Sequence, residues 1–418
     1  MMRIAIATWT SRQVGGAETY LSRTVSTFVS AGHHVVLCFE SDEPDDRPRF
    51  AIPAGVMTMS AADLGGAAVL DRLREWQPDV VYVHGLKDPS FEQRVQSIAP
   101  SVFFAHAYYG TCISGNKAHL FPVVQPCARR FGAACLALYY PRRCGGLNPV
   151  TFAREYARQR RRLRLLRRYA AVLTHSEHMR QEYLRHGAAG GRVFNCSVTT
   201  DDASNVPPFH AVPVPTDRVR VRHLVFAGRM DPLKGGEELL RAAAVAHQRL
   251  ESPLRVTLAG DGSERSRWEL VARDLGTRHE GLSIHFTGWL GPAGVARLLA
   301  TADVLAMPSL WPEPFGLIGQ EANRQGVPVV AYATGGIPEW LVDGVNGCSA
   351  PGNPPTVEGL ADALVRCLSD RDRHRAMRRA AVVAGHSRPD DQHIAAVLDV
   401  LQQVAAERRA APVVAFAR

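Results

Sequence analysis

The chain has 418 residues, of which 46% are hydrophobic and 21% charged, and its formal net charge is +9. One hydrophobic core rarely organises this length, so we expect two or three domains. No segment approaches the roughly 20 consecutive apolar residues that span a bilayer, and the first residues lack the apolar stretch and cleavage site of a signal peptide. The composition therefore indicates a multidomain globular protein, which we expect in the cytoplasm.

Alternating strand and helix signals fill the first half of the chain. Apolar and amphipathic patterns predict strands and helices in the order 3–9 (strand), 17–31 (helix), 34–39 (strand), 70–76 (helix), and 79–84, 101–106 and 171–175 (strands). This alternation is typical of a parallel sheet covered by helices, so we expect a Rossmann-like domain at 1–205. The last three strands end in His84, His106 and His175. The carboxyl ends of parallel strands face one crevice, so these histidines should meet there.

Four cysteines fall in one irregular stretch, separated by 15, 8 and 9 residues: Cys112, Cys127, Cys135 and Cys144. The stretch contains no CxxC pair. Buried free thiols and a structural metal site both remain compatible with this spacing. Disulfides do not fit a reducing cytoplasm.

A basic run, AREYARQRRRLRLLRR, concentrates much of the positive charge between Arg154 and Arg168. Its composition predicts a helix. One interpretation is a solvated helix face; another is a helix that lies on a membrane surface or binds an anionic, lipid-linked substrate. Binding to nucleic acid is not expected, because no recognition motif accompanies the run and few aromatic residues interrupt it.

A stretch rich in Pro, Asp, Ser and Thr separates the two halves, and we place a linker at 206–222. The alternation then restarts and predicts a second Rossmann-like domain at 223–390, with strands at 223–227, 255–259, 283–287, 303–307 and 328–333 and helices at 236–249, 264–275 and 292–300. The remaining residues, 391–418, predict a C-terminal helix that could cross back to the first domain, followed by a tail.

Polar loops of the second half indicate a binding pocket. In GRMDPLKG at 228–235, Arg229 and Lys234 supply two cations, which suit a diphosphate. In EPFGLIGQE at 313–321, Glu313 and Glu321 supply carboxylates that can accept hydrogen bonds from vicinal hydroxyls. Backbone amides beside the following helix could receive phosphate; they belong to Phe315, Gly316, Leu317 and Ile318. Together these loops predict a pocket for a nucleotide sugar.

Six motifs in one order carry a family resemblance: GGAE at 15, GRMDPLKG at 228, GDG at 260, FTG at 286, EPFGLIGQE at 313 and GGIPEWLVDGVNG at 335. This order resembles the retaining glycosyltransferases of family 4. The resemblance covers most of the chain and is most specific from 223 to 350. It implies an α/β protein of the GT-B fold, with two Rossmann-like, doubly wound domains that face a central cleft.

The resemblance also implies roles for individual residues. Arg229 and Lys234 would bind the donor diphosphate and stabilise the leaving group without a divalent metal, and Glu321 would hold the ribose hydroxyls. Glu313 would lie near the transferred sugar and His106 near the acceptor, while Gly15 and Gly16 would approach the donor phosphate or the acceptor. The cysteine stretch resembles an insertion in some family members, so we expect it to form part of the acceptor pocket. Each residue also has a plain structural alternative, such as a surface turn, a helix cap or a hydrogen-bonded strand end.

The implied activity is transfer of a hexose from a nucleotide-diphosphate sugar to an acceptor hydroxyl with retention, and no cofactor is required. The acceptor could be a glycan, a lipid-linked molecule or a natural product, and the basic run could contact the inner face of a membrane. A nucleotide-sugar epimerase or phosphorylase of the same fold is an alternative, and so is an inactive donor-binding partner subunit. The Arg- and Ala-rich composition indicates a bacterial source.

Overall fold

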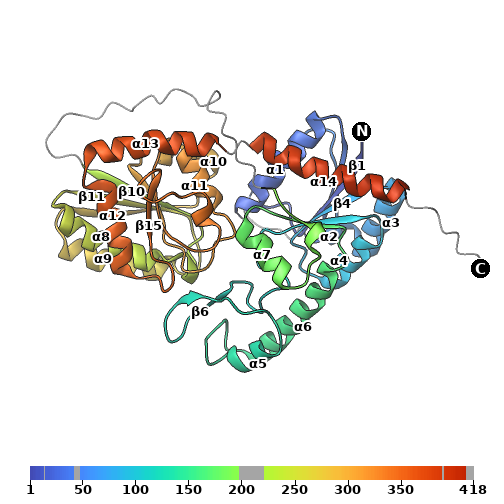
Figure 1. Ribbon diagram of the computed structural model, residues 1–418, viewed down its shortest axis with the longest axis horizontal. Coiled ribbons are helices and arrows are strands. Elements are labelled where there is room, and N and C mark those ends of the chain that lie inside the picture. Colours follow the sequence, from blue (N-terminus) through green and yellow to red (C-terminus); the bar gives the residue numbers. More distant parts are fainter. Residues whose placement is uncertain (14, 42–47, 197–220, 388–389, 411–418) are drawn as a thin grey trace, which may run out of the picture.

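Two helix-covered parallel sheets organise the chain into two lobes (Figure 1). The computed structural model describes residues 1–410 apart from 14, 42–47, 197–220 and 388–389. The strands follow the predicted alternation closely, because each is an apolar run whose alternate residues face opposite sides of its sheet. Most of the predicted linker at 206–222, and the predicted tail PVVAFAR at 412–418, lie outside the described residues.

The first lobe contains a seven-stranded sheet with the order β3-β2-β1-β4-β5-β8-β9. Its strands are β1 (Arg3–Thr8), β2 (His34–Phe39), β3 (Met57–Ser60), β4 (Val80–His84), β5 (Ser101–Phe104), β8 (Ala171–Thr174) and β9 (Val193–Asn195). The helices of this lobe are α1 (Gly16–Ser30), α2 (Ala61–Leu64), α3 (Gly66–Trp76), α4 (Pro89–Gln96), α5 (Ala134–Leu138), α6 (Pro149–Leu166) and α7 (Glu177–Arg185). A short antiparallel pair, β6 (Ala118–His119) and β7 (Gln125–Pro126), lies apart from the sheet. The strand order reverses between β1 and β4, where a doubly wound sheet binds its ligand.

The second lobe contains a six-stranded sheet with the order β12-β11-β10-β13-β14-β15. Its strands are β10 (Arg222–Ala227), β11 (Leu254–Ala259), β12 (Leu282–Gly288), β13 (Val304–Met307), β14 (Val329–Tyr332) and β15 (Gly347–Ala350). Its helices are α8 (Gly236–Leu250), α9 (Arg265–Arg278), α10 (Pro292–Ala300), α11 (Leu317–Arg324), α12 (Val357–Leu368) and α13 (Arg371–His386). Here the order reverses between β10 and β13, so the loops after these two strands open onto the ligand crevice.

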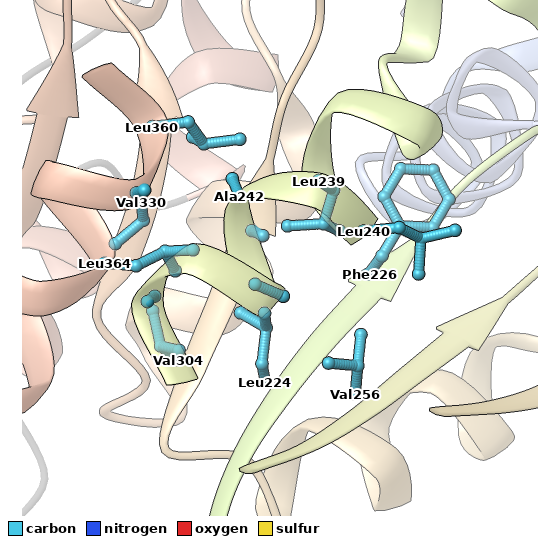
Figure 2. Packing of buried hydrophobic residues seen from close by; sticks show 14 of the residues in the cluster. Leu224, Phe226, Leu239, Leu240, Ala242, Val256, Val304, Val330, Leu360 and Leu364 are labelled. Carbon is cyan, nitrogen blue, oxygen red and sulfur yellow. The ribbon is translucent and has the colours of Figure 1, made fainter. Parts of the chain in front are cut away.

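Alternate strand residues build two separate cores on the faces of the second sheet. Figure 2 shows one of them, where Leu224 and Val256 lie under α8 and Val330 lies near α12. The intervening residues Val225 and Leu305 face the other side and pack with α11 and its neighbours. This period of two explains why each strand appears in the sequence as an unbroken apolar run.

The C-terminal helix, α14 (Asp390–Ala410), lies against the first lobe (Figure 1). It contacts α1, β4 and β8. Ile394, Val397 and Leu401 are buried in the same hydrophobic cluster as the strand residues of that sheet. No helix in the described part of the chain, not even this one, combines the length and the hydrophobicity that spanning a membrane would require.

We predict that Leu401→Ala lowers the free energy of unfolding by about 2–5 kcal/mol, because it removes a fully buried side chain and leaves a cavity. Urea denaturation monitored by circular dichroism measures the change. The exposed neighbour Gln402 provides the control, since Gln402→Ala should shift the midpoint little. Equal, small effects of the two substitutions would show that α14 contributes no stability to the first lobe.

Candidate active site

The reversal of strand order in the second sheet brings two predicted loops together. Lys234 ends the short 3-10 helix Pro232–Lys234 after β10, and Glu313 follows β13. Between Lys234 and α8, Gly235 has φ +68°, and a Cβ atom there would overlap the carbonyl oxygen of Pro308. Only glycine allows this close approach of the two loops.

The carboxylate of Glu313 is the centre of a hydrogen-bonded cluster. Its Oε1 accepts from Lys234 Nζ at 2.5 Å, Ser309 Oγ at 2.6 Å and Trp311 Nε1 at 3.0 Å. The side chain is buried. Burial raises the pKa of Glu313, but the Lys234 charge and the three hydrogen bonds outweigh it, so the pKa lies below its ordinary value. Glu313 is therefore an ionised carboxylate with a fixed orientation.

The first lobe holds the turn around Glu313 by its backbone. Tyr108 donates its hydroxyl to the carbonyl oxygen of Pro312 at 2.7 Å, and Ser176 donates to that of Pro314 at 2.5 Å. From the second lobe, the Gly336 amide donates to the carbonyl oxygen of Glu313 at 2.7 Å. The turn at 312–314 is thus fixed from both lobes.

A further contact between the lobes lies at the N-terminus of α7. The Glu339 carboxylate accepts hydrogen bonds from the backbone amides of Glu177 and His178, at 2.9 and 2.8 Å. Helix N-termini attract carboxylates, because their first amides lack partners within the helix. Sequence reasoning missed Tyr108, Ser176 and Glu339. Of these three residues, only Ser176 could have been recognised in the sequence, because a serine before a helical segment is typical of an N-cap.

Two helix N-termini from different lobes lie close together. A methyl group at Gly16, the first residue of α1, would lie 3.4 Å from Cδ1 of Leu317, the first residue of α11. The amide of Gly15 donates to the Glu18 carboxylate at 2.7 Å, which caps α1. The predicted residues Gly15, Gly16, Leu317 and Ile318 therefore lie at one place, where the helix dipoles favour an anion.

The other predicted donor-side residues differ in their surroundings. The Arg229 side chain is 63% exposed, and its guanidinium lies 3.5 Å from the Asp231 carboxylate, so it takes no part in the Glu313 cluster. Glu321 is half-buried on α11. Phe315 is buried, its ring stacks on His175 of the first lobe at 5.5 Å between centres, and Gly316 caps α11 with φ +90°. The roles predicted for these residues stay predictions.

The three strand-end histidines of the first lobe do meet, as the parallel sheet requires. Nδ1 of His84 lies 2.9 Å from Nε2 of His106, and the ring centres of His106 and His175 are 6.3 Å apart. Tyr20 of α1 contacts His106 edge-on, and His393 of α14 stacks on His175. Burial, with a smaller effect of His393, lowers the pKa of His106 to about 3, so this imidazole is neutral at physiological pH.

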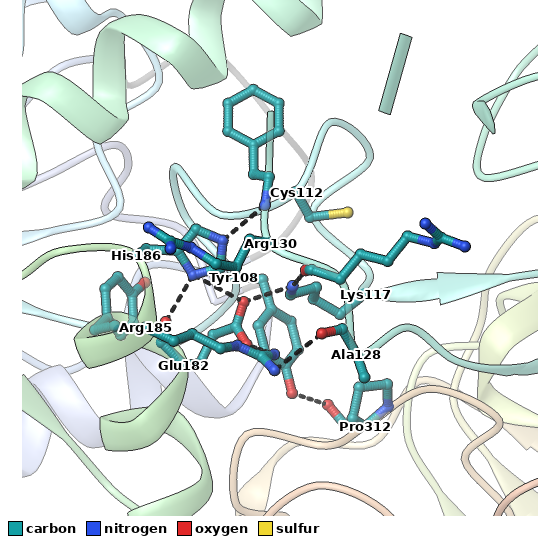
Figure 3. A network of polar contacts seen from close by, with 12 residues as sticks. Tyr108, Cys112, Lys117, Ala128, Arg130, Glu182, Arg185, His186 and Pro312 are labelled. Carbon is teal, nitrogen blue, oxygen red and sulfur yellow. Dashed lines mark hydrogen bonds and ion pairs between the residues drawn. The ribbon is translucent and has the colours of Figure 1, made fainter. Parts of the chain in front are cut away.

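A buried ion pair fixes the cysteine-containing stretch to α7. Lys117 Nζ lies 2.7 Å from Glu182 Oε1, and Arg185 binds the same carboxylate (Figure 3). The amide of Phe131 also donates to His186 at 2.8 Å. This network joins the stretch to α7, whose N-terminal amides bind the Glu339 carboxylate. Tyr108, which is also drawn in Figure 3, donates its hydroxyl to the carbonyl oxygen of Pro312.

The four cysteines of this stretch, Cys112, Cys127, Cys135 and Cys144, are free and half-buried. Burial and the neighbouring thiols raise the pKa of Cys144 to about 11. In the described part of the chain, no group of three or more His, Cys, Asp or Glu side chains is placed to hold a metal ion. The possible structural metal site at these cysteines stays a prediction.

Comparisons with known proteins agree with this geometry. A model of glycosyltransferase family 4 matches residues 14–202, and a model of glycosyl transferases group 1 matches 218–382. A D-inositol 3-phosphate glycosyltransferase of Corynebacterium urealyticum is 37% identical over 158 residues, or 36% of each chain, and one of Xylanimonas cellulosilytica is 35% identical over 195 residues, 45% of this chain and 43% of that one. The matched segment thus spans well under half the length of these curated relatives.

Solved structures resemble nearly the whole chain. A crystal structure of Anabaena HepE in complex with UDP and glucose has a TM-score of 0.64 at 20% identity, and the match covers 98% of this chain and 100% of that one. Sucrose-phosphate synthase from Thermosynechococcus elongatus gives 0.63 at 18% identity, with 98% of both chains covered. These likenesses confirm the predicted GT-B fold.

We predict that Glu313→Gln lowers the free energy of unfolding near neutral pH by about 1–3 kcal/mol, because it leaves the Lys234 ammonium without its buried counter-charge. The folded pKa of Glu313 is depressed, so its stabilisation is complete above the unfolded carboxyl pKa of about 4.3 and is lost as the pH falls through the folded pKa. The stability difference between wild type and variant should therefore shrink in acid. Urea titrations over a pH series measure it.

The exposed carboxylate of Glu280 offers a matched control, since Glu280→Gln removes the same charge without touching a buried cation. Its effect should be small at every pH. A wild-type advantage over Glu313→Gln that stays constant into the acid range would contradict the assignment of an ionised, Lys234-bound carboxylate.

Proposed function

Since the chain belongs to glycosyltransferase family 4, we propose that it transfers a sugar from a nucleotide diphosphate to an acceptor hydroxyl. The observation that carries the proposal is that two helix N-termini from different lobes meet at Gly16 and Leu317, while the Lys234–Glu313 pair lies at the strand reversal of the second sheet. The first amides of a helix lack internal partners and attract anions. A donor diphosphate is an anion that two such N-termini would bind.

The loop after β10 would supply the cations for this diphosphate. An ammonium has three donors, and Lys234 uses one on Glu313, so two remain for phosphate oxygens. Among the described residues, the exposed Arg229 has one ion pair, a long contact with Asp231, for which phosphate would compete. Both cations would stabilise the charge that develops on the leaving diphosphate. On this account the reaction needs no divalent metal at the diphosphate and no other cofactor.

The two glutamates would position the donor through its hydroxyl groups. All three hydrogen bonds to Glu313 end on Oε1, so Oε2 can accept one from the transferred sugar. Glu321, farther along α11, would accept hydrogen bonds from the ribose. A carboxylate held by three donors, one of them a lysine, is a weak nucleophile, so Glu313 suits this binding role better than a covalent one.

We expect transfer with retention of the anomeric configuration. The acceptor would attack on the face from which the diphosphate leaves, and a donor phosphate oxygen would take the acceptor proton. His106, which is neutral at physiological pH, would orient the acceptor hydroxyl by a hydrogen bond. Its low pKa supports this role, because an imidazole with a pKa of about 3 is a poor general base near neutral pH.

The comparisons suggest which substrates to try first. The structural neighbour HepE was crystallised with UDP and glucose, so a UDP-hexose is the first donor to test. Curated relatives of the matched segment are D-inositol 3-phosphate glycosyltransferases, which makes a phosphorylated polyol a reasonable first acceptor. We propose a hexosyl donor on this basis.

We predict that one class of nucleotide sugar raises the melting temperature of the wild-type protein, and that Lys234→Ala and Arg229→Ala each lower turnover of that donor by about 10²–10³. Thermal shift with UDP-, GDP-, ADP- and dTDP-sugars finds the donor, and release of the nucleotide diphosphate measures turnover. Arg241→Ala, on the exposed side of α8, is the charge-matched control and should change neither.

The products separate the proposal from its alternatives. A glycoside whose anomeric configuration matches that of the donor, by NMR, supports retaining transfer, whereas an altered free donor would indicate an epimerase. Failure of every donor to bind or turn over, or a Lys234→Ala variant with wild-type turnover, would contradict the proposed function.

A further inference from the structure

The outer face of α6 carries a stripe of exposed residues, most of them arginines, that the proposed chemistry does not use. Positions three or four residues apart share one side of a helix. Along α6 these positions are all exposed, and they are Val150, Arg154, Ala157, Arg161 and Arg164. The inner face differs, because Arg162 is buried there and donates to the carbonyl oxygens of Leu86 and Lys87.

The arginines toward the C-terminal end of α6 lack counter-ions. Glu155 pairs with Arg158 at 2.7 Å and lies 3.9 Å from Arg154. In the described part of the chain, no carboxylate forms an ion pair with the following five: Arg160, Arg161, Arg164, Arg167 and Arg168. Four of them, all except Arg167, line an open groove of about 440 Å³ between α6 and Gln93 of α4. This surface attracts anions and is not neutralised by the protein itself.

An apolar edge adjoins the other end of the stripe. Leu147 and Val150, at the start of α6, are 72% and 73% exposed. Phe121 and Val123, 49% and 51% exposed, lie in the turn between β6 and β7. The Phe121 amide donates to the carbonyl oxygen of Arg142 at 3.2 Å, so this turn is fixed to the segment that leads into α6. In Figure 1, β6, α5 and the start of α6 together form one end of the first lobe.

We infer that the α6 stripe and this apolar edge form a docking surface for an anionic lipid bilayer. Arginines bind lipid phosphates and acidic headgroups, while exposed Leu, Val and Phe side chains gain free energy by entering the interfacial region. The apolar edge favours a bilayer over nucleic acid, whose binding depends mainly on contacts between basic side chains and phosphates. Docking would bring the lobe that we expect to bind the acceptor to a membrane surface, and it does not depend on the transferase chemistry.

The test is cosedimentation of the full-length protein with phosphatidylcholine vesicles that contain or lack phosphatidylglycerol. The wild type should sediment only with the anionic vesicles, and less at high salt. The double variant Arg161→Ala/Arg164→Ala should lower partitioning by about 20-fold or more, since each basic side chain near such a surface contributes roughly a factor of five. The control Arg371→Ala/Arg379→Ala removes two exposed arginines of α13 and should partition like the wild type.

A second pair of variants tests the apolar edge. Leu147→Ser/Val150→Ser should lower partitioning severalfold even at high salt, whereas Leu270→Ser/Val383→Ser, at exposed positions of the second lobe, should not. Equal sedimentation with neutral and anionic vesicles would overturn the inference, and so would equal losses in the test and control variants. Loss of RNA binding in Arg161→Ala/Arg164→Ala with vesicle binding unchanged would assign the stripe to nucleic acid instead.

Discussion

The structure depends on one turn, residues 312–314, which both lobes hold at once. Its backbone carbonyls accept hydrogen bonds from Tyr108 and Ser176 of the first lobe, while the carboxylate of Glu313 is bound by Lys234 of the second. The exposed hydrogen bonds of a loop are individually weak, but here Tyr108 and Ser176 are buried, so their alternative partner, water, is excluded. The turn is therefore a fixed point between two otherwise separate sheets.

This constraint links the two halves of the proposed reaction. Lys234 and Glu313 lie at the strand reversal of the second sheet, and His106 lies near that of the first. Group transfer between bound molecules needs donor and acceptor sites in a defined relation, because misplacement by about 1 Å can cost a hundredfold in rate. The contacts of Tyr108, Ser176 and Glu339 hold the two lobes in a defined position relative to each other. The same helix, α7, carries Glu182, so the buried pair with Lys117 extends the fixed region to the cysteine-containing stretch.

Much of the fold and part of the site could be predicted from the sequence. Strands were found because buried parallel strands are apolar runs, and the meeting of His84 with His106 followed from the topology alone. The contacts between lobes could not be predicted. Tyr108 and Pro312 are 204 positions apart, and the acceptor is a backbone carbonyl, which every residue possesses. The sequence did not indicate the buried Lys117–Glu182 ion pair either. Lysine and glutamate are ordinarily exposed, and only the packing of an irregular stretch buries these two.

The most direct test of this account is a steady-state comparison of Tyr108→Phe/Ser176→Ala with the wild type, together with calorimetric measurement of donor binding. The double variant removes both hydroxyls that hold the turn and leaves Arg229, Lys234 and both glutamates in place. We expect kcat to fall by roughly tenfold to a hundredfold while the donor Kd changes much less, since Arg229, Lys234 and both glutamates lie in the second lobe and only the first lobe changes its position relative to them. A wild-type kcat in the double variant would contradict the claim that this turn couples the two lobes.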